Sequence, residues 1–400
     1  MEDTRRKRYA GMALAAICIG YLAPNYAQYQ LSPLAGSLME ELSISASQFS
    51  SLFTAPMIPA IFLSLVAGIL VDKHNPRLVV GIAFVISTIG AALNLAGNSY
   101  GTLFLGFALT GVAAAFLNSC GAKLLGSWYP PEQLSSKLGI GFAFSTLAMT
   151  VALATTAYFP NRHSAFAVAL VVFVASTIGW FALYRNPEPV ADSGSSAPAA
   201  GEKGEQPGLG ALLKRVMSSS GVWLVGLALF CVMGANVVMS SFVPTILQSR
   251  GIDAVASGYY SSAYTIGNLV SCIVVPMVAQ KAGTKRTVLV LDVCAFLLVA
   301  FGWMAPDGFL LAAALFLAGF FLGGNMPILQ SVPIKLAGIG PELAGTAGGL
   351  VATVELLGAV FLPSYVLIPA AGGNLATAFV LAGVCMLVSC ALTRPLPKEV

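Results

Sequence analysis

One carboxyl group lies at the centre of a long apolar stretch. Glu355 occupies the middle of the segment 342–368 and has no Lys or Arg within a helical turn. An ionised carboxylate in lipid costs about 3 kcal/mol, so we expect this group to be protonated at neutral pH. Such a group suits proton coupling or the binding of a cationic head. The alternative that the sequence leaves open is a structural hydrogen bond to a neighbouring helix.

Uncharged polar side chains recur within other apolar segments, and several share a helical face. Asn25, Gln28 and Tyr29 are spaced i, i+3 and i+4, and Tyr264 and Asn268 are also four apart. Amides and hydroxyls suit a polar solute, although in membrane helices they also bridge one helix to another. We predict that these five side chains bind substrate. The predicted set also contains Asn118, Asn236, Asn325, Gln330 and Glu355.

The elements that must position these groups are membrane-spanning helices. Apolar residues make up 57% of the chain and charged residues 9%, against about 25% charged in a soluble domain. A spanning helix needs about 20 mostly apolar residues, and strand-type alternation is absent. The sequence therefore predicts an all-α membrane protein with twelve transmembrane helices, at 9–31, 47–71, 78–98, 100–125, 136–158, 164–184, 220–247, 254–280, 286–304, 308–330, 342–368 and 374–394.

The basic residues predict the orientation. With twelve spans, eighteen of the 20 Lys and Arg residues fall on the side of the two termini, and only Arg162 and Arg250 fall on the other. Cytoplasmic loops carry an excess of Lys and Arg. We therefore expect a multi-pass protein of the inner or plasma membrane with both termini in the cytoplasm.

The two halves of the chain repeat each other. Asn25 and Pro33 are matched by Asn236 and Pro244 at a constant offset of 211. By similar offsets, the repeat mate of Asn118 is Asn325. Between the halves lies a stretch rich in Pro, Gly, Ser and Ala, which is typical of a flexible linker. We predict two pseudo-symmetric six-helix bundles, 1–184 and 219–400, joined by a cytoplasmic linker at 185–218.

The loop that follows the second segment carries the most specific motif. It reads Gly68-Ile-Leu-Val-Asp72-Lys73-His-Asn-Pro-Arg77, and a degenerate copy in the second half has Gln280 in place of the Asp. This loop resembles the signature of the major facilitator superfamily, and helix count, linker and orientation agree along the whole chain. The alternative is a basic loop that only sets the topology.

The resemblance implies roles for these loop residues. Gly68, Asp72, Lys73 and Arg77 would form a cytoplasmic gate, in which Asp72 contacts the opposite bundle and Arg77 joins its ionic cluster. We expect Asp292, about two turns into the segment 286–304, to join that cluster. The resemblance also implies that a cavity is lined by helices 1, 4, 7 and 10 together with 2, 5, 8 and 11.

Two hints about the substrate conflict. The stretch 242–260 and the segment from 340 to 363 look like the cyanate, nitrate and organic-anion branches, which favours a small organic anion. Glu355, without a Lys or Arg near the membrane midplane, favours a neutral or cationic solute, or an acid that moves with its proton. Phe107 stands where many proton-linked members carry an Arg.

The leading hypothesis is secondary active transport of a small organic solute by alternating access, with protons as a candidate coupling ion. The alternatives are a non-transporting receptor or sensor and a lipid translocase on the same fold. A sensor should carry a sizeable soluble domain, and a translocase should carry a cation in its cavity. No catalytic or metal-ligating constellation is present, so we expect no enzyme activity, cofactor or metal. We expect a monomer surrounded by membrane lipid, with no nucleic-acid partner.

Overall fold

The computed structural model describes residues 2–186, 216–333, 336 and 341–396. Side chains are described in the same ranges except at 2–4, 64–66, 68–69, 72–73, 122, 131–136, 138 and 341–346. Within the described residues, 12 helices are long and apolar enough to cross a membrane. The predicted all-helical fold and its twelve spans are therefore confirmed.

The helices of the first half form the N-terminal bundle. In chain order they are α1 (Glu2–Tyr29), α2 (Ala35–Glu41), α3 (Ala46–Thr54), the 3-10 turn η1 (Ala55–Met57), α4 (Ile58–Lys73), α5 (Pro76–Ala96), α6 (Tyr100–Gly126), α7 (Pro131–Thr155), η2 (Thr156–Tyr158) and α8 (Arg162–Leu183).

The helices of the second half form the C-terminal bundle. They are α10 (Ser220–Ser249), α11 (Ala254–Ala282), α12 (Thr284–Phe301), η3 (Gly302–Met304), α13 (Phe309–Gly323), α14 (Asn325–Ser331), α15 (Pro341–Phe361), the π-helical segment η5 (Leu362–Leu367), α16 (Ile368–Ala370) and α17 (Leu375–Thr393).

Three of the predicted spans are interrupted. The second span breaks at η1, which contains Pro56, and the eleventh passes through η5, which contains Pro363. Proline lacks a backbone N–H and disturbs the helical hydrogen-bond ladder. The tenth span breaks between α13 and α14 at Gly324. By contrast, α1 and α10 remain continuous through Pro24 and Pro244.

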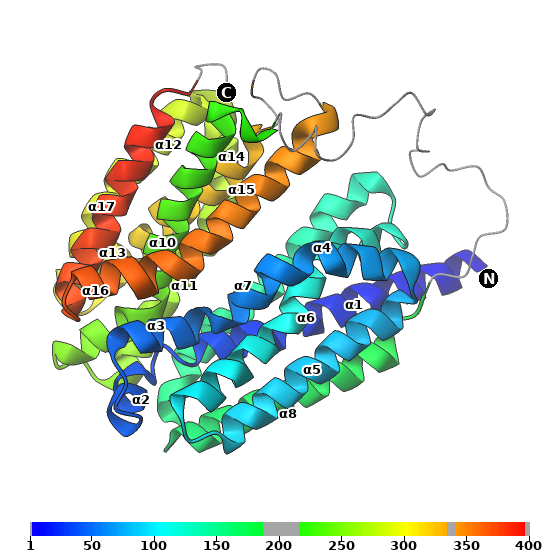
Figure 1. Ribbon diagram of the computed structural model, residues 1–400, viewed down its shortest axis with the longest axis horizontal. Coiled ribbons are helices and arrows are strands. Elements are labelled where there is room, and N and C mark those ends of the chain that lie inside the picture. The colour runs from blue at the N-terminus through cyan, green and yellow to red at the C-terminus, as the bar shows by residue number, and fades with distance from the viewer. Residues whose placement is uncertain (1, 187–215, 334–335, 337–340, 397–400) are drawn as a thin grey trace.

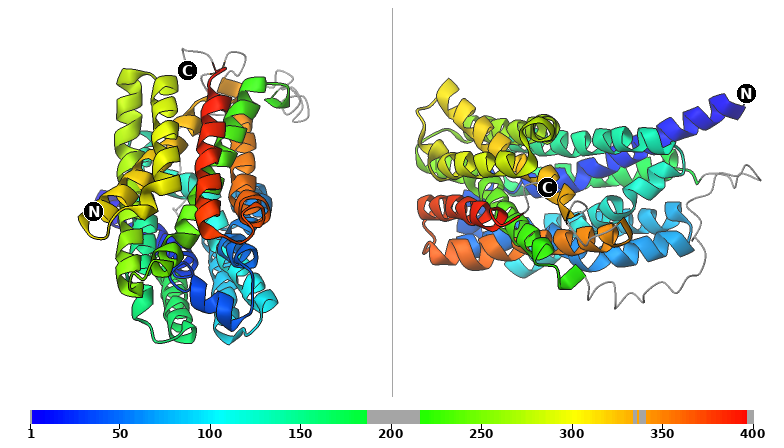
Figure 2. Two further views of the ribbon diagram at one scale, coloured as in Figure 1. Left: turned by 90° about the vertical axis from the view of Figure 1, so that its left-hand side faces the viewer. Right: turned by 90° about the horizontal axis from the view of Figure 1, so that it is seen from above.

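The two bundles are inclined to one another and separate toward the side that carries the chain termini (Figure 1). Within each bundle the long helices run alongside one another, as the two views in Figure 2 show. At the opposite side the bundles meet, where α3 contacts η5 and α16, and α7 contacts α11. We call these the terminal side and the closed side.

Hydroxyl groups join the bundles at the closed side. Six hydrogen bonds connect them among the described residues: Ser32–Ser241 carbonyl, Ser47–Ser364 carbonyl, Ser50–Ser364, Thr150–Thr265, Ser262–Thr150 carbonyl and Tyr158–Tyr259. Gly258 allows the close approach of α11 to α7, because a Cβ there would lie 2.3 Å from the Leu153 carbonyl oxygen. We call this set of contacts the hydroxyl seam.

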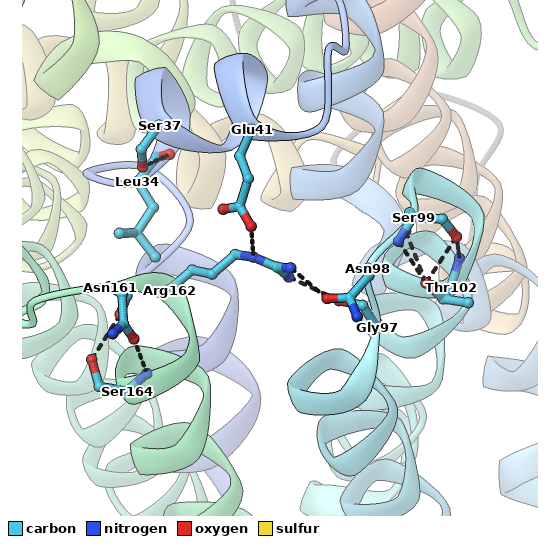
Figure 3. Close-up of polar contacts among 10 residues, drawn as sticks. All are labelled: Leu34, Ser37, Glu41, Gly97, Asn98, Ser99, Thr102, Asn161, Arg162 and Ser164. Carbon is cyan, nitrogen blue, oxygen red and sulfur yellow. Dashed lines mark hydrogen bonds and ion pairs between the residues drawn. The ribbon is translucent and has the colours of Figure 1, made fainter.

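One buried arginine fixes the short helix α2 on the closed side (Figure 3). Arg162 begins α8, and its side chain is 4% exposed. Its Nε lies 2.8 Å from Glu41 of α2, and its two terminal nitrogens donate to the Gly97 carbonyl and to Asn98 Oδ1, each at 2.8 Å. This one side chain therefore ties together α2, the α5–α6 connection and α8.

The outer surfaces of the bundles are apolar. Large hydrophobic side chains are exposed on helices that face away from the other bundle, including Ile82 and Ile89 on α5, Val171 and Ile178 on α8, and Phe309 on α13. Water would disfavour such a surface, whereas lipid tails would cover it without cost. The surface agrees with a chain that spans a membrane.

Candidate functional site

A cavity of about 320 Å³ lies between the two bundles. Its walls come from α1, η1, α4, α6 and α7 on one side, and from α10, α11, α14 and α15 on the other. These elements belong to spans 1, 2, 4, 5, 7, 8, 10 and 11, which are the spans that the resemblance predicted. The cavity is therefore a shared site that neither bundle can form alone.

Seven of the predicted substrate-binding residues line this cavity. They are Asn25, Gln28, Tyr29, Asn118, Asn236, Tyr264 and Asn268. The repeat pair Asn25 and Asn236 thus faces one space from the two bundles. Their role in binding stays a prediction.

Hydrogen bonds to the protein hold several polar side chains of the cavity in place. Asn25 Nδ2 donates to the Tyr21 carbonyl at 2.8 Å, and Gln28 Nε2 donates to the Phe53 carbonyl at 2.9 Å. Ser240 donates to Asn236 Oδ1 at 3.1 Å. These bonds fix the rotamers of the amides, so the cavity presents a preformed set of polar groups.

One hydroxyl of the cavity is poorly paired. The ring of Tyr264 is 2% exposed, and its hydroxyl lies beside Ser240 and Asn268 without a hydrogen bond of normal geometry among the described residues. A buried hydroxyl without a partner costs about 1–3 kcal/mol. A solute that bonds to Tyr264 would remove that cost.

The lining of the cavity is uncharged. Besides amides and hydroxyls it consists of Ala, Val, Leu, Pro, Phe and Met side chains, and no Asp, Glu, Lys, Arg or His is among the described residues that line it. Methionines contribute from both bundles, through Met57 and Met149 on one side and Met233 and Met326 on the other. This surface suits a small solute with both polar and apolar parts.

Glu355 and Gln330 do not line the cavity. Gln330 Nε2, on α14, donates to Glu355 Oε2, on α15, at 2.9 Å. Glu355 is 6% exposed, and the next residue, Leu356, is part of the lining. The carboxyl is therefore held one position away from the solute space, and its coupling role stays a prediction.

The structure corrects the expected surroundings of Asp292 and Asn325. Asn325 does not face the cavity with its repeat mate Asn118; it is fully buried and donates from Nδ2 to Asp292 Oδ1 at 2.9 Å. The break at Gly324 places Asn325 at the start of a new helix and turns it toward α12. Asp292 is likewise fully buried in the C-terminal bundle, so the expectation that it joins an ionic cluster at the loop was wrong.

The predicted gate is only partly described. The side chains at Gly68, Asp72 and Lys73 lie outside the described residues, so their gating role stays a prediction. Arg77 is described, and its guanidinium donates to the Phe181 carbonyl of α8. The Arg77 carbonyl in turn accepts from Trp180 Nε1 at 2.9 Å. Arg77 thus makes these contacts within its own bundle.

Five polar residues of the lining were not predicted from the sequence: Tyr21, Ser145, Thr146, Ser240 and Thr265. Helical spacing could have found two of them, because Tyr21 lies four residues before Asn25 and Ser240 four residues after Asn236. Ser145 is the repeat mate of Glu355, so the internal repeat carried a signal for one more of the five.

A protein-family model and several known proteins match this chain. The family model described as Major Facilitator Superfamily matches residues 9–363. The chain belongs to the major facilitator superfamily. A probable sulfoacetate transporter, SauU of Cupriavidus necator, is 25% identical over 86% of this chain and 83% of its own length.

Other relatives match over a shorter stretch. A probable L-galactonate transporter of Escherichia coli K12 is 25% identical over 47% of this chain, and the hexuronate transporter of the same strain is 24% identical over 47%. The match spans less than half of these two relatives, 42% and 44% of their lengths.

Solved structures share the fold. A bacterial homologue of the human lysosomal transporter Spinster superposes with a TM-score of 0.76 at 14% identity, over 97% of this chain and 95% of that one. A D-xylose–proton symporter superposes with a TM-score of 0.75 at 12% identity, over 98% and 99%. Family and relatives together support a solute transporter.

Proposed function

We propose that this chain is a secondary active transporter that moves a small organic acid across the inner or plasma membrane by alternating access, together with a proton. The observation that carries the proposal is the cavity of about 320 Å³ between the two bundles, with polar groups from both and the hydroxyl seam on one side of it. A site shared by two bundles that contact at one side is what alternating access requires.

The distribution of basic residues gives the direction in which the cavity faces. In the topology predicted from the sequence, eighteen of the 20 Lys and Arg residues lie on the side of the two termini, which the positive-inside rule assigns to the cytoplasm. The closed side, with Arg162 and Arg250, then faces outward. We infer that this conformation is inward-facing and that the hydroxyl seam is its outer gate.

The chemistry of the substrate follows from two facts. Relatives are described as transporters of sulfoacetate, L-galactonate and hexuronate, which are small organic acids. The cavity, however, offers amides and hydroxyls and no cationic side chain among its described lining residues. An anion without a countercharge is costly inside a membrane. Movement of the acid with a proton resolves both facts, because the pair carries less charge than the anion.

Glu355 is the group that we propose for coupling. It is 6% exposed and bonded to Gln330, and its neighbour Leu356 touches the solute space. Gln330 is exposed, so water reaches the neighbourhood of the carboxyl and can exchange a proton with it. Binding of a solute against Leu356 would shift α15 and change the surroundings of the carboxyl.

Uptake into proteoliposomes tests the proposal. We expect one or more of sulfoacetate, L-galactonate and D-galacturonate to accumulate under an inwardly directed proton gradient, and a protonophore to stop this accumulation. Galactose, which lacks the acid, serves as the matched neutral solute. Accumulation of galactose but of none of the three acids would overturn the proposed substrate class.

Glu355→Gln tests the coupling role. We expect the variant to exchange solute across the membrane but to lose accumulation against a gradient, because an amide cannot carry the proton. Thr353→Val is the matched control, because Thr353 is exposed on the same helix, and it should accumulate solute as the native chain does. A Glu355→Gln protein that still accumulates solute with the native pH dependence would assign Glu355 a structural role only.

A further inference from the structure

A buried acid–amide pair lies inside the C-terminal bundle, apart from the cavity. Asp292 on α12 and Asn325 at the start of α14 are both 0% exposed, and Asn325 Nδ2 donates to Asp292 Oδ1 at 2.9 Å. Neither residue lines the cavity. The proposed transport cycle makes no use of this carboxyl.

The second oxygen of the Asp292 carboxyl and the amide oxygen of Asn325 are unpaired among the described residues. Asp292 Oδ2 and Asn325 Oδ1 are buried with no hydrogen-bond partner among the described residues, and so is Oγ of Ser389, which lies beside the carboxyl on α17. Unpaired buried polar atoms are rare in native proteins. A proton on the carboxyl would turn Oδ2 into a donor for Asn325 Oδ1, which can only accept, whereas the Ser389 hydroxyl can either donate or accept.

No countercharge holds Asp292 in its ionised form. Titratable groups on the elements around it are Cys231 on α10 and Cys385 and Cys390 on α17, and the charged groups stand at helix ends: Lys281 at the end of α11, Lys285 and Arg286 at the start of α12, and Arg394 just after α17. Arg394 lies beside the thiol of Cys390 and interacts with it, and Lys285 donates to the Leu396 carbonyl at 2.8 Å. The sequences of α13 and α14 contain no charged residue. The two ion pairs found among the described residues both lie elsewhere, and an uncompensated buried charge is strongly unfavourable.

The pair adjoins the break in the tenth span, which backs the cavity wall. Asn325 follows Gly323 and Gly324, and neither glycine has room for a Cβ: at Gly323 it would lie 2.5 Å from the Asn268 side chain, and at Gly324 2.7 Å from that of Val275. Asn268 lines the cavity. A change in the Asp292–Asn325 bond would therefore act on the helix break against which this wall residue packs.

We propose that Asp292 and Asn325 form a second proton-binding site, in the core of the C-terminal bundle, separate from Glu355 and from the solute cavity. The neutral carboxyl completes the pair with Asn325. Loss of the proton places an uncompensated charge at the helix break and loosens the wall at Asn268. This site would make the packing of the bundle depend on pH even in the absence of solute.

Asp292→Asn tests this site, because an asparagine amide can donate where the protonated carboxyl would. An aspartate in an unfolded chain is ionised above about pH 4, so the folded native chain holds one proton more than the unfolded chain. Its stability therefore falls as pH rises. We expect the unfolding constant of the native chain, divided by that of Asp292→Asn, to rise up to tenfold per pH unit.

The measurement is unfolding of the purified full chain in detergent at a series of pH values between about 5.5 and 8.5. Asp307→Asn is the control. Asp307 is an exposed aspartate, with 62% of its side chain accessible. The unfolding constant of the native chain divided by that of Asp307→Asn should therefore not change with pH. A ratio for Asp292→Asn that is equally flat would overturn the proposal.

An infrared measurement covers the case in which Asp292→Asn does not fold. Carboxylic acids absorb at a carbonyl frequency distinct from that of carboxylates, and aspartate labelled with ¹³C at its carboxyl shifts that band without moving the band of Glu355. We expect the native chain at neutral pH to contain a protonated-carboxyl band that shifts with the aspartate label. Absence of a label-dependent band would show that Asp292 is ionised, and this result is independent of the outcome for Glu355.

Discussion

Arg162 offers a quantitative test of the closed side. Arg162→Met keeps the aliphatic stem but removes the donors to Glu41, to the Gly97 carbonyl and to Asn98 Oδ1. The Gly97 carbonyl is buried, and a buried acceptor without a donor costs about 1–3 kcal/mol. The substitution also removes the other hydrogen bonds that the guanidinium makes. Together, these losses should lower the free energy of unfolding by about 3 kcal/mol.

Glu41→Gln removes the same ion pair from its other end and should cost much less. The side chain of Glu41 is 48% exposed, against 4% for Arg162. An exposed ion pair contributes about 0–1 kcal/mol, and glutamine still offers an oxygen to Arg162 Nε. We therefore expect a loss of at most about 1 kcal/mol from Glu41→Gln.

The assay is equilibrium unfolding of the purified chain in mixed micelles. Arg250→Met is the matched control in the other bundle, because Arg250 also bonds to an aspartate and to backbone carbonyls but has a side chain that is 25% exposed. It should lose about 1 kcal/mol. If Glu41→Gln destabilised the chain as much as Arg162→Met, the ion pair would carry the stabilisation, and the reasoning from the buried carbonyl would be refuted.

Two further predictions concern the closed side and the orientation. Gly258→Val should push α11 away from α7 and so raise the labelling of a cysteine at position 240 by an impermeant thiol reagent applied from outside. Gly101→Ala should not raise it, because no atom lies within 4 Å of the added Cβ. Unchanged labelling in Gly258→Val would refute the gate. In a variant without the native cysteines, a cysteine at position 307 should react from outside in intact cells and one at position 74 should not, and the reverse pattern would invert the proposed orientation.

The sequence pattern was sufficient to predict the spans, and the family resemblance implied which of them line the cavity. Each span is a long apolar run with few charges, and the internal repeat aligned Asn25 with Asn236, which the structure places around one cavity. The spans follow from the length of the apolar runs and the repeat from residue spacing, and a single sequence shows both.

Other features depend on contacts that periodicity does not encode. Glu355 lies one residue from the lining residue Leu356, and a shift of one residue turns a side chain by about 100° around a helix. Asn325 does not face the cavity as predicted, because its span breaks at Gly324. Arg162 was read only as a topology signal, since nothing in the sequence connects residues 41, 97 and 162.

The hydroxyl seam has a consequence for how the closed side opens. All six of its hydrogen bonds come from Ser, Thr or Tyr hydroxyls, and the two ion pairs found among the described residues each lie within one bundle. Dissolved ions screen contacts between charges, but they have little to screen between hydroxyls and carbonyls. The rate at which this side opens should therefore be nearly independent of ionic strength, so that a cell in dilute or salty surroundings would operate the same gate at the same speed.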